Sequence, residues 1–233
     1  MKYFYYTKNN IVSLFFIFPF FLMYEILSSI LFDESNYIIR NSADIIFRDI
    51  LSIITNNTFL TFNSLLLIGI SAYLIINYNK TDDNFNLLFM FLMFIEGVVL
   101  GIILVFLLNG FDFLNLNYDY YLYDYNFMFY SCLGAGIWEE ILFRFIFLNL
   151  FILISSKFFS KYSSLTISIF VSSLLFSFFH YIGSLGDVFI LYTFIIRLFG
   201  GIYLSIVYLY RGLGISMISH IIYDFILVTI PVI

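Results

Sequence analysis

The chain has 233 residues, of which 63% are hydrophobic and only 11% are charged, and its formal net charge is -5. Soluble domains are about half apolar and about one quarter charged, so this composition is typical of a membrane protein. The acidic balance and the lack of a basic stripe argue against a nucleic-acid partner, because such binders need clustered cations to neutralise phosphates. A single cysteine, Cys132, excludes an internal disulfide.

Seven apolar stretches are long enough to cross the hydrocarbon core, which takes about 20 helical residues. In chain order they are Ile11–Phe32, Thr58–Tyr78, Phe85–Leu108, Phe127–Ile154, Ser163–Ile182, Val188–Tyr210 and Leu213–Ile230. Segment Ser42–Thr55 alternates charged and apolar residues, which predicts an amphipathic helix in the interface, with a short packed helix as the alternative. We therefore expect an all-α, polytopic membrane protein with about seven to eight transmembrane helices.

Charges between the apolar stretches predict the orientation in the membrane. If each stretch crosses once, the basic residues collect on one side: Lys2, Lys8, Lys80, Lys157, Lys161 and Arg211. The acidic residues collect on the other: Asp33, Glu34, Asp112, Asp119, Asp124 and Asp187. The positive-inside rule then places the amino terminus in the cytoplasm and the carboxyl terminus outside, with Arg40 as the exception.

The apolar run Phe127–Ile154 contains adjacent carboxylates, Glu139 and Glu140, followed by Arg144. A charge in hydrocarbon costs several kcal/mol, so such residues mark a candidate functional site. Helical residues turn by about 100° each, so Glu140 and Arg144 share a face and can neutralise each other. Glu139 points elsewhere and is left free to face a polar cavity and act as a general base; the alternative is an ion pair beside one protonated acid. The small residues at 134–136 would allow close helix approach or local unwinding.

The chain has two histidines, and both fall in apolar segments. His180 ends one segment, whereas His220 and Asp224 are four residues apart and share a helix face. Each has a simpler explanation, either interfacial hydrogen bonding or a polar pair joining two helices, but signals on three helices favour one shared site. With straight spans His180 would lie nearer the outer face than Glu139, so a shared site requires a tilted helix or a turn back near 183–187.

The remaining intramembrane charges are Glu25, Glu96 and Arg197. Buried acid–base pairing is the simplest explanation for such residues, and we expect Glu96 to pair with Arg197.

Three motifs resemble those of one family of membrane proteases. Glu139-Glu140-Ile-Leu-Phe-Arg144 matches Glu-Glu-x3-Arg, Phe176-Ser-Phe-Phe-His180 matches Phe-x3-His, and His220-Ile-Ile-Tyr-Asp224 matches His-x3-Asn/Asp. Together they resemble the CPBP family, the CAAX-processing and bacteriocin-processing intramembrane endopeptidases, also called the Abi or CAAX protease family. The resemblance covers about residues 127–228.

The resemblance implies an intramembrane endopeptidase that hydrolyses a peptide bond in a membrane-associated protein or peptide. It implies that Glu139 and His180 activate the attacking water, while His220 and Asp224 stabilise the tetrahedral oxyanion. Asp224 stands where the best-understood relatives have asparagine, so it would act as a protonated donor or by orienting His220.

The resemblance also sets expectations for organisation and partners. Glu140 and Arg144 would support the site within a single membrane domain over 1–233, with N-terminal spans and the interfacial helix in 1–126 and the catalytic core in 127–230. The site suits either a metal-free glutamate base or a divalent metal such as zinc, with four candidate ligands: Glu139, His180, His220 and Asp224. We expect the lipid bilayer and a membrane-associated substrate as partners, no nucleic acid, and a location in a bacterial plasma membrane.

Two other functions compete with proteolysis. A non-catalytic scaffold or bacteriocin-immunity protein of the same family would bind its partner without Glu139. A small proton-coupled transporter would use the same acids and histidines as a relay. No inverted repeat or pair of broken helices supports transport.

Overall fold

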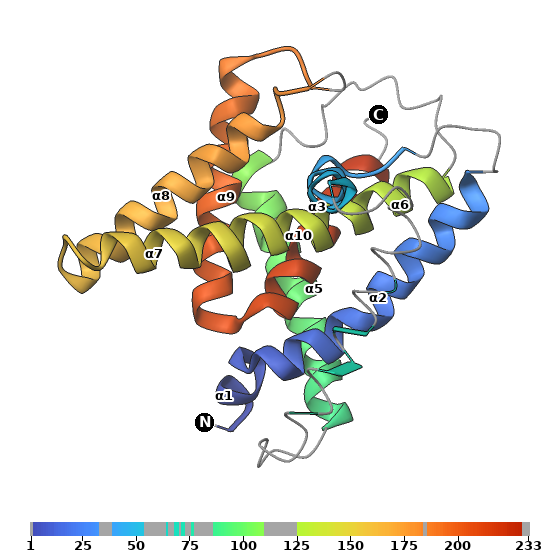
Figure 1. The fold of residues 1–233 in the computed structure, drawn as a ribbon, viewed down its shortest axis with the longest axis horizontal. Helices are drawn as coiled ribbons and strands as arrows, with labels where there is room; N and C mark the ends of the chain where they lie inside the picture. The colour runs from blue at the N-terminus through green and yellow to red at the C-terminus, as the bar shows by residue number, and fades with distance from the viewer. Residues whose placement is uncertain are drawn as a thin grey trace.

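The computed structural model in Figure 1 describes residues 2–32, 39–53, 64, 68–69, 71–72, 76, 86–109, 125–183 and 186–229, and no strand occurs in them. Its helices are α1 (Lys2–Lys8), α2 (Asn10–Leu31), α3 (Ser42–Ser52), α5 (Leu87–Asn109), α6 (Tyr125–Gly134), the π-helix η4 (Ala135–Leu148), α7 (Asn149–Ser155), α8 (Lys161–Phe179), α9 (Leu191–Arg211) and α10 (Leu213–Thr229). The predicted span Thr58–Tyr78 lies almost wholly outside the described residues. So do several charges used for the orientation: Asp33, Glu34, Lys80, Asp112, Asp119 and Asp124.

Within this part of the chain, four helices are long and apolar enough to cross a membrane: α2, α5, α8 and α9. The shorter helix α10 is also apolar. The prediction of an all-α, polytopic membrane protein is therefore confirmed.

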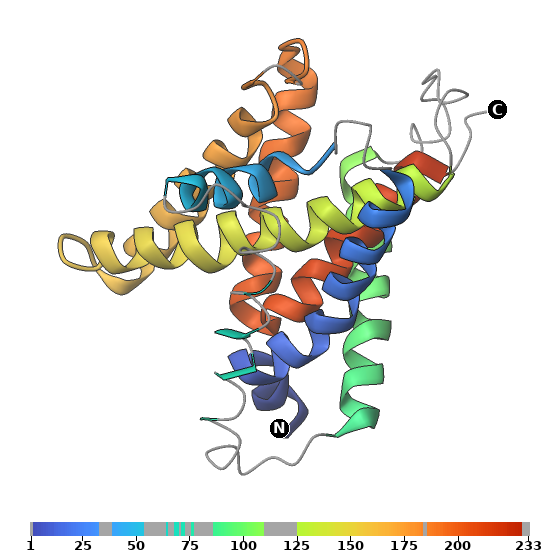
Figure 2. The ribbon, with the colours of Figure 1, turned by 45° about the vertical axis from the view of Figure 1, so that its right-hand side comes forward.

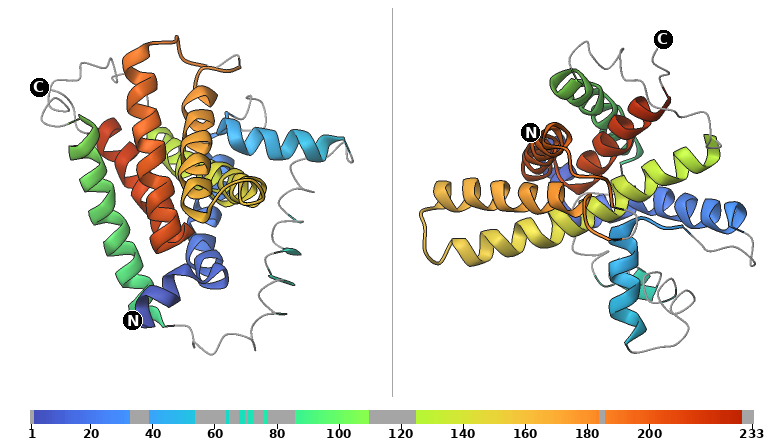
Figure 3. Two further views of the ribbon diagram at one scale, coloured as in Figure 1. Left: turned by 90° about the vertical axis from the view of Figure 1, so that its left-hand side faces the viewer. Right: turned by 90° about the horizontal axis from the view of Figure 1, so that it is seen from above.

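The predicted span Phe127–Ile154 is one continuous helix made of α6, η4 and α7, which we call the composite helix (125–155). Figure 2 shows it running across the direction of α5 and α9 rather than alongside them. Helix α8 turns back after α7 and packs against both α7 and η4, as the right panel of Figure 3 shows. This hairpin returns His180, at the end of the 19 residues of α8, to the level of Glu139. The difference in depth expected from straight spans is therefore removed by the slope of these two helices.

Helix α10 lies at the centre and packs along α5. Two glycines of α5 permit this close contact: a Cβ atom on Gly97 would come within 2.6 Å of the Ile218 Cβ, and one on Gly101 within 2.8 Å of the Ser219 carbonyl oxygen. Small residues at a helix interface let the two backbones approach, which is a common way to join helices in membranes. The central place of α10 makes it the support for the residues described below.

Helix α3 turns two of its three charged residues inward, Asp44 and Arg48, while Asp49 is exposed. Asp44 is fully buried and Arg48 nearly so, whereas Ile50 and Ile53 on the other side are exposed. Because α3 packs against η4, the packed alternative describes it better than an interfacial helix with a wet charged face.

Four charged residues around α3 form what we call the N-terminal ion cluster: Glu25, Arg40, Asp44 and Arg48. Arg40 Nη1 donates to both Glu25 Oε1 and Asp44 Oδ2 at 2.9 Å, and Arg48 Nε donates to Asp44 Oδ1 at 2.7 Å. Burial alone would lower the pKa of Arg40, but hydrogen bonds and charges from Glu25 and Asp44 raise it above its usual value. The one exception to the positive-inside pattern, Arg40, is thus held by buried carboxylates.

The predicted pairing of Glu96 with Arg197 is wrong. Glu96 pairs with Arg211 and accepts a hydrogen bond from Tyr3 at 2.7 Å, while Arg197 pairs with Asp187. Helices α5 and α9 run in opposite directions in Figure 1, and Glu96 of α5 meets Arg211 at the end of α9, whereas Arg197 near its beginning meets Asp187. The kind of interaction was predicted correctly, but its partners were not.

Candidate active site

The site begins where η4 meets α10. A Cβ atom on Gly136 would lie 2.2 Å from Ile221 Cγ1 and 3.1 Å from the Met217 carbonyl oxygen, so only glycine permits this approach. The contact places Glu139 and Glu140, one turn further along η4, against His220 on α10. The predicted role of residues 134–136 in close helix approach is therefore found in the structure.

The same glycine-containing segment opens the helix into a π-helix, which runs from Ala135 to Leu148. Wider turns of this kind occur mostly at functional sites. Here the widened helix carries both Glu139, which lines a cavity, and Glu140, which is fully buried. The local unwinding predicted from the small residues takes this form.

Glu140 is held from three directions. Arg144 Nη1 lies 2.9 Å from its Oε1 as an ion pair, Ser216 donates to its Oε2 at 2.6 Å, and His220 Nδ1 donates to its Oε1 at 2.8 Å. Helical phase predicted the Arg144 contact but not the other two. Glu140 therefore does more than neutralise an arginine, because it also fixes which nitrogen of His220 faces the cavity.

Glu139 has one bound oxygen and one open oxygen. Its Oε1 accepts a hydrogen bond from Asn41 Nδ2 at 2.8 Å. Its Oε2 faces two imidazole nitrogens, His180 Nε2 at 3.8 Å and His220 Nε2 at 4.0 Å. These two gaps are too long for hydrogen bonds but each can be bridged by one water molecule.

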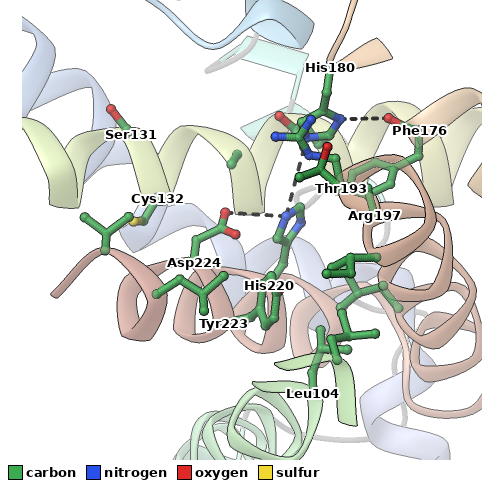
Figure 4. A pocket seen from close by; sticks show the side chains of 18 of the residues that line it. Leu104, Ser131, Cys132, Phe176, His180, Thr193, Arg197, His220, Tyr223 and Asp224 are labelled. Atoms are coloured by element: carbon green, nitrogen blue, oxygen red, sulfur yellow. Dashed lines mark hydrogen bonds and ion pairs between the residues drawn. The ribbon is translucent and has the colours of Figure 1, made fainter. Parts of the chain in front are cut away.

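The two imidazoles are oriented from behind. His180 Nδ1 donates to the Phe176 carbonyl oxygen at 2.8 Å, so a neutral His180 presents an unprotonated Nε2 to the cavity. On the other side, His220 Nε2 lies 3.5 Å from Asp224 Oδ2. The Phe176 ring packs edge-on against both imidazoles, with centroids 4.9 and 5.8 Å away. Figure 4 shows His180, His220 and Asp224 converging in this way.

These side chains line one cavity of about 540 Å³. Its polar wall also contains Thr193 and Arg197 of α9, visible in Figure 4. The rest of the wall is largely apolar and comes from α5, α9 and α10: Leu104, Leu108, Ile196, Leu204, Leu227 and Val228. A cavity with a few convergent polar groups and apolar walls is the usual form of a substrate site.

Residues 122–226 match the Rce1-like family model, described as type II CAAX prenyl endopeptidase. This segment, 105 of the 233 residues, is thus similar to the CAAX proteases. It contains all three motifs and therefore every polar residue that lines the cavity except Asn41. The lining residues Leu104, Leu108, Leu227 and Val228 also lie outside the match. The search of curated proteins and the search of solved structures each gave no match.

The four candidate ligands do not form a metal site in this geometry. In the described part of the chain, no three His, Cys, Asp or Glu side chains are grouped so that they could hold a metal ion. A zinc site stays a prediction that metal analysis of the purified protein would test.

Sequence motifs alone miss two residues of this site. The first is Ser216, whose hydroxyl donates a hydrogen bond to Glu140 Oε2. Asn41 lies 98 residues from Glu139 in the sequence, outside any spacing pattern and outside the family match. Only the folded position of α3 brings it to the site.

Proposed function

We propose that the protein is an intramembrane endopeptidase that hydrolyses a peptide bond in a membrane-associated protein or peptide. The observation that carries this proposal is the open oxygen of Glu139, which faces His180 Nε2 and His220 Nε2 across gaps of 3.8 and 4.0 Å. One water in this space can contact all three groups, and one further atom of a substrate carbonyl can lie beside it.

Glu139 and His180 act on the attacking water. As the water oxygen bonds to the carbonyl carbon, Glu139 Oε2 takes its proton, and the unprotonated Nε2 of His180 holds the water by accepting its second hydrogen. The proton then passes from Glu139 to the leaving nitrogen as the carbon–nitrogen bond breaks. The products are a carboxylic acid and an amine, and no other reactant is needed.

His220 and Asp224 stabilise the oxyanion that forms on the carbonyl oxygen. His220 keeps Nδ1 on Glu140, so in its protonated form it presents Nε2–H to the cavity. Asp224 lies 3.5 Å from that nitrogen and either orients it or donates from a protonated carboxyl group. Donors aimed at developing charge in a site shielded from bulk water account for a large part of such catalysis.

The cavity walls indicate the class of substrate. Apolar residues from three membrane helices surround the polar end, so the chain next to the cleaved bond is apolar and reaches the site from the bilayer. The family description names CAAX prenyl endopeptidases, which makes a prenylated CAAX peptide one suitable probe. We place the enzyme in a bacterial plasma membrane, as proposed from the sequence motifs.

The experiment uses the purified full chain in proteoliposomes, with a prenylated CAAX peptide and a panel of single-span transmembrane peptides. Mass spectrometry of the products identifies any cleavage site. Cleavage by the wild-type protein that is lost in Glu139→Gln supports the proposal. Glu96→Gln is the matched control, because Glu96 is another glutamate of a membrane helix but does not line the cavity.

Two results would contradict the proposal. Wild-type rates in the Glu139→Gln protein would remove Glu139 from catalysis. If the wild-type protein cuts no probe, and a membrane partner co-purifies equally with wild type and Glu139→Gln, the chain is a binding scaffold.

A further inference from the structure

We propose that Asn41, held in place by the N-terminal ion cluster, is a positioning residue for Glu139. The inference rests on the proposed function and assigns part of the active site to the N-terminal half of the chain. That half lies outside the family match, which begins at residue 122. Asn41 therefore completes a site whose other polar groups all come from the matched segment.

The two ends of the Asn41 side chain have different partners. Its Oδ1 accepts from the Ala43 backbone N–H at 2.9 Å and caps the start of α3, while its Nδ2 donates to Glu139 Oε1 at 2.8 Å. Turning the amide over would place oxygen against the carboxylate and NH2 against the backbone N–H, and both contacts would be repulsive. The cap therefore fixes the direction in which the amide donates.

The N-terminal ion cluster fixes where the amide lies. Arg40, directly before Asn41, binds Glu25 and Asp44 with both arms of its guanidinium, at 2.9 to 3.1 Å. Arg48 ties the next turn of α3 to the same two carboxylates at 2.7 and 2.9 Å. Breaking buried ion pairs of this kind is costly. Arg40 and Arg48 therefore hold α3 against α2 through Glu25, and they brace the first turns of α3 through Asp44.

This arrangement determines how Glu139 presents its charge. Glu139 Oε1 accepts its hydrogen bond from the neutral amide of Asn41. The oxygen that remains for water is therefore Oε2, which faces His180 and His220. The other charged and titratable groups around the cavity are Glu140 and Arg144 on η4, His180 after α8, Asp187 and Arg197 before and on α9, and His220 and Asp224 on α10.

The test uses substitutions that keep the helix cap. Serine and aspartate cap helices about as well as asparagine, so Asn41→Ser and Asn41→Asp retain α3 while removing the donor. Serine is too short to reach Glu139, and aspartate places a like charge against it. Asn149→Ser is the matched control, because Asn149 Nδ2 also donates to a side chain, Tyr208 at 2.6 Å, but away from the cavity.

In proteoliposomes with a peptide that the wild type cleaves, we expect Asn41→Ser to lower kcat about 10- to 100-fold, with KM nearly unchanged. Asn41→Asp should lower kcat further. Asn149→Ser should change neither kcat nor KM.

The outcomes separate this inference from the proposed function. If Glu139→Gln is inactive while Asn41→Ser keeps the wild-type kcat and KM, Asn41 has no positioning role and the protease proposal stands. If Glu139→Gln is active, the protease proposal itself fails. Should Asn41→Ser melt early, the better-matched Asn41→Asp decides: wild-type kcat in that protein would overturn the inference.

Discussion

Two groups of charged residues in the described part of the chain differ in how closely their members contact one another: the N-terminal ion cluster and the cavity. In the N-terminal ion cluster, Arg40 and Arg48 contact Glu25 and Asp44 at 2.7 to 3.1 Å. In the cavity, Glu139 Oε2 stands 3.8 and 4.0 Å from two imidazoles, and His220 stands 3.5 Å from Asp224. The first arrangement neutralises its charges in direct contact, whereas the second leaves space for a reacting molecule. We therefore propose that the N-terminal ion cluster stabilises the fold and that the cavity around Glu139 is where the reaction takes place.

The largest expected effect comes from replacing the open carboxylate. Glu139→Gln keeps the shape and can still accept from Asn41, but it cannot take a proton from water. We expect kcat to fall by about 10³-fold with little change in melting temperature. Product formation measured by mass spectrometry, beside thermal melting in detergent, distinguishes this from unfolding; a large loss of stability would argue that Glu139 is structural.

Glu140→Gln should lower stability strongly and kcat less, the reverse of Glu139→Gln. Glu140 is fully buried against Arg144, so the substitution leaves a cation without its partner and lowers the free energy of unfolding by about 4 kcal/mol. His220 Nδ1 can still donate to the glutamine oxygen, so the loss of kcat should be smaller than in Glu139→Gln. Chemical unfolding and cleavage rates on the same samples test this ranking, which fails if Glu140→Gln is the less active of the two.

Asp44→Asn breaks the closed cluster at its fully buried member. Arg40 and Arg48 lose one of the two carboxylates that neutralise them and keep Glu25, so stability should fall by about 3 kcal/mol. Because the cluster anchors the residue next to Asn41, kcat should also fall by about 10-fold. Unaltered kcat together with the loss of stability would show that the two charge groups are independent.

The smallest effect is expected at Glu96, which pairs with Arg211 and Tyr3. Its side chain is 27% exposed, so Glu96→Gln should cost at most about 1 kcal/mol of stability and leave kcat and its pH profile unchanged. A shifted pH profile in this variant would show that charges outside the cavity also control the site.

Spacing along the sequence was sufficient to predict which residues of one helix lie on the same face. The four-residue separation of Glu140 and Arg144 predicted their contact, and that of His220 and Asp224 predicted their common face, because spacing along one helix sets direction. The partners of Glu96 and Arg197 were wrong because the choice among several opposite charges depends on which helix ends lie level. Asn41 could not be found for a related reason: its only signal was a helix cap, which polar residues provide throughout proteins.

Composition and the length of the apolar stretches were enough to predict a helical membrane protein, because the free energy of placing a residue in lipid or water depends mainly on its own side chain. The three motifs could likewise be read directly from the sequence. The tertiary structure decided that the composite helix crosses the bundle, that α8 folds back along it, and that His180 therefore reaches Glu139. It also decided that α3 turns Asp44 and Arg48 inward and that Asn41 reaches Glu139. Helix slopes and contacts between distant segments arise from packing, such as the close fit of Gly136 against α10, and packing is not local in the sequence.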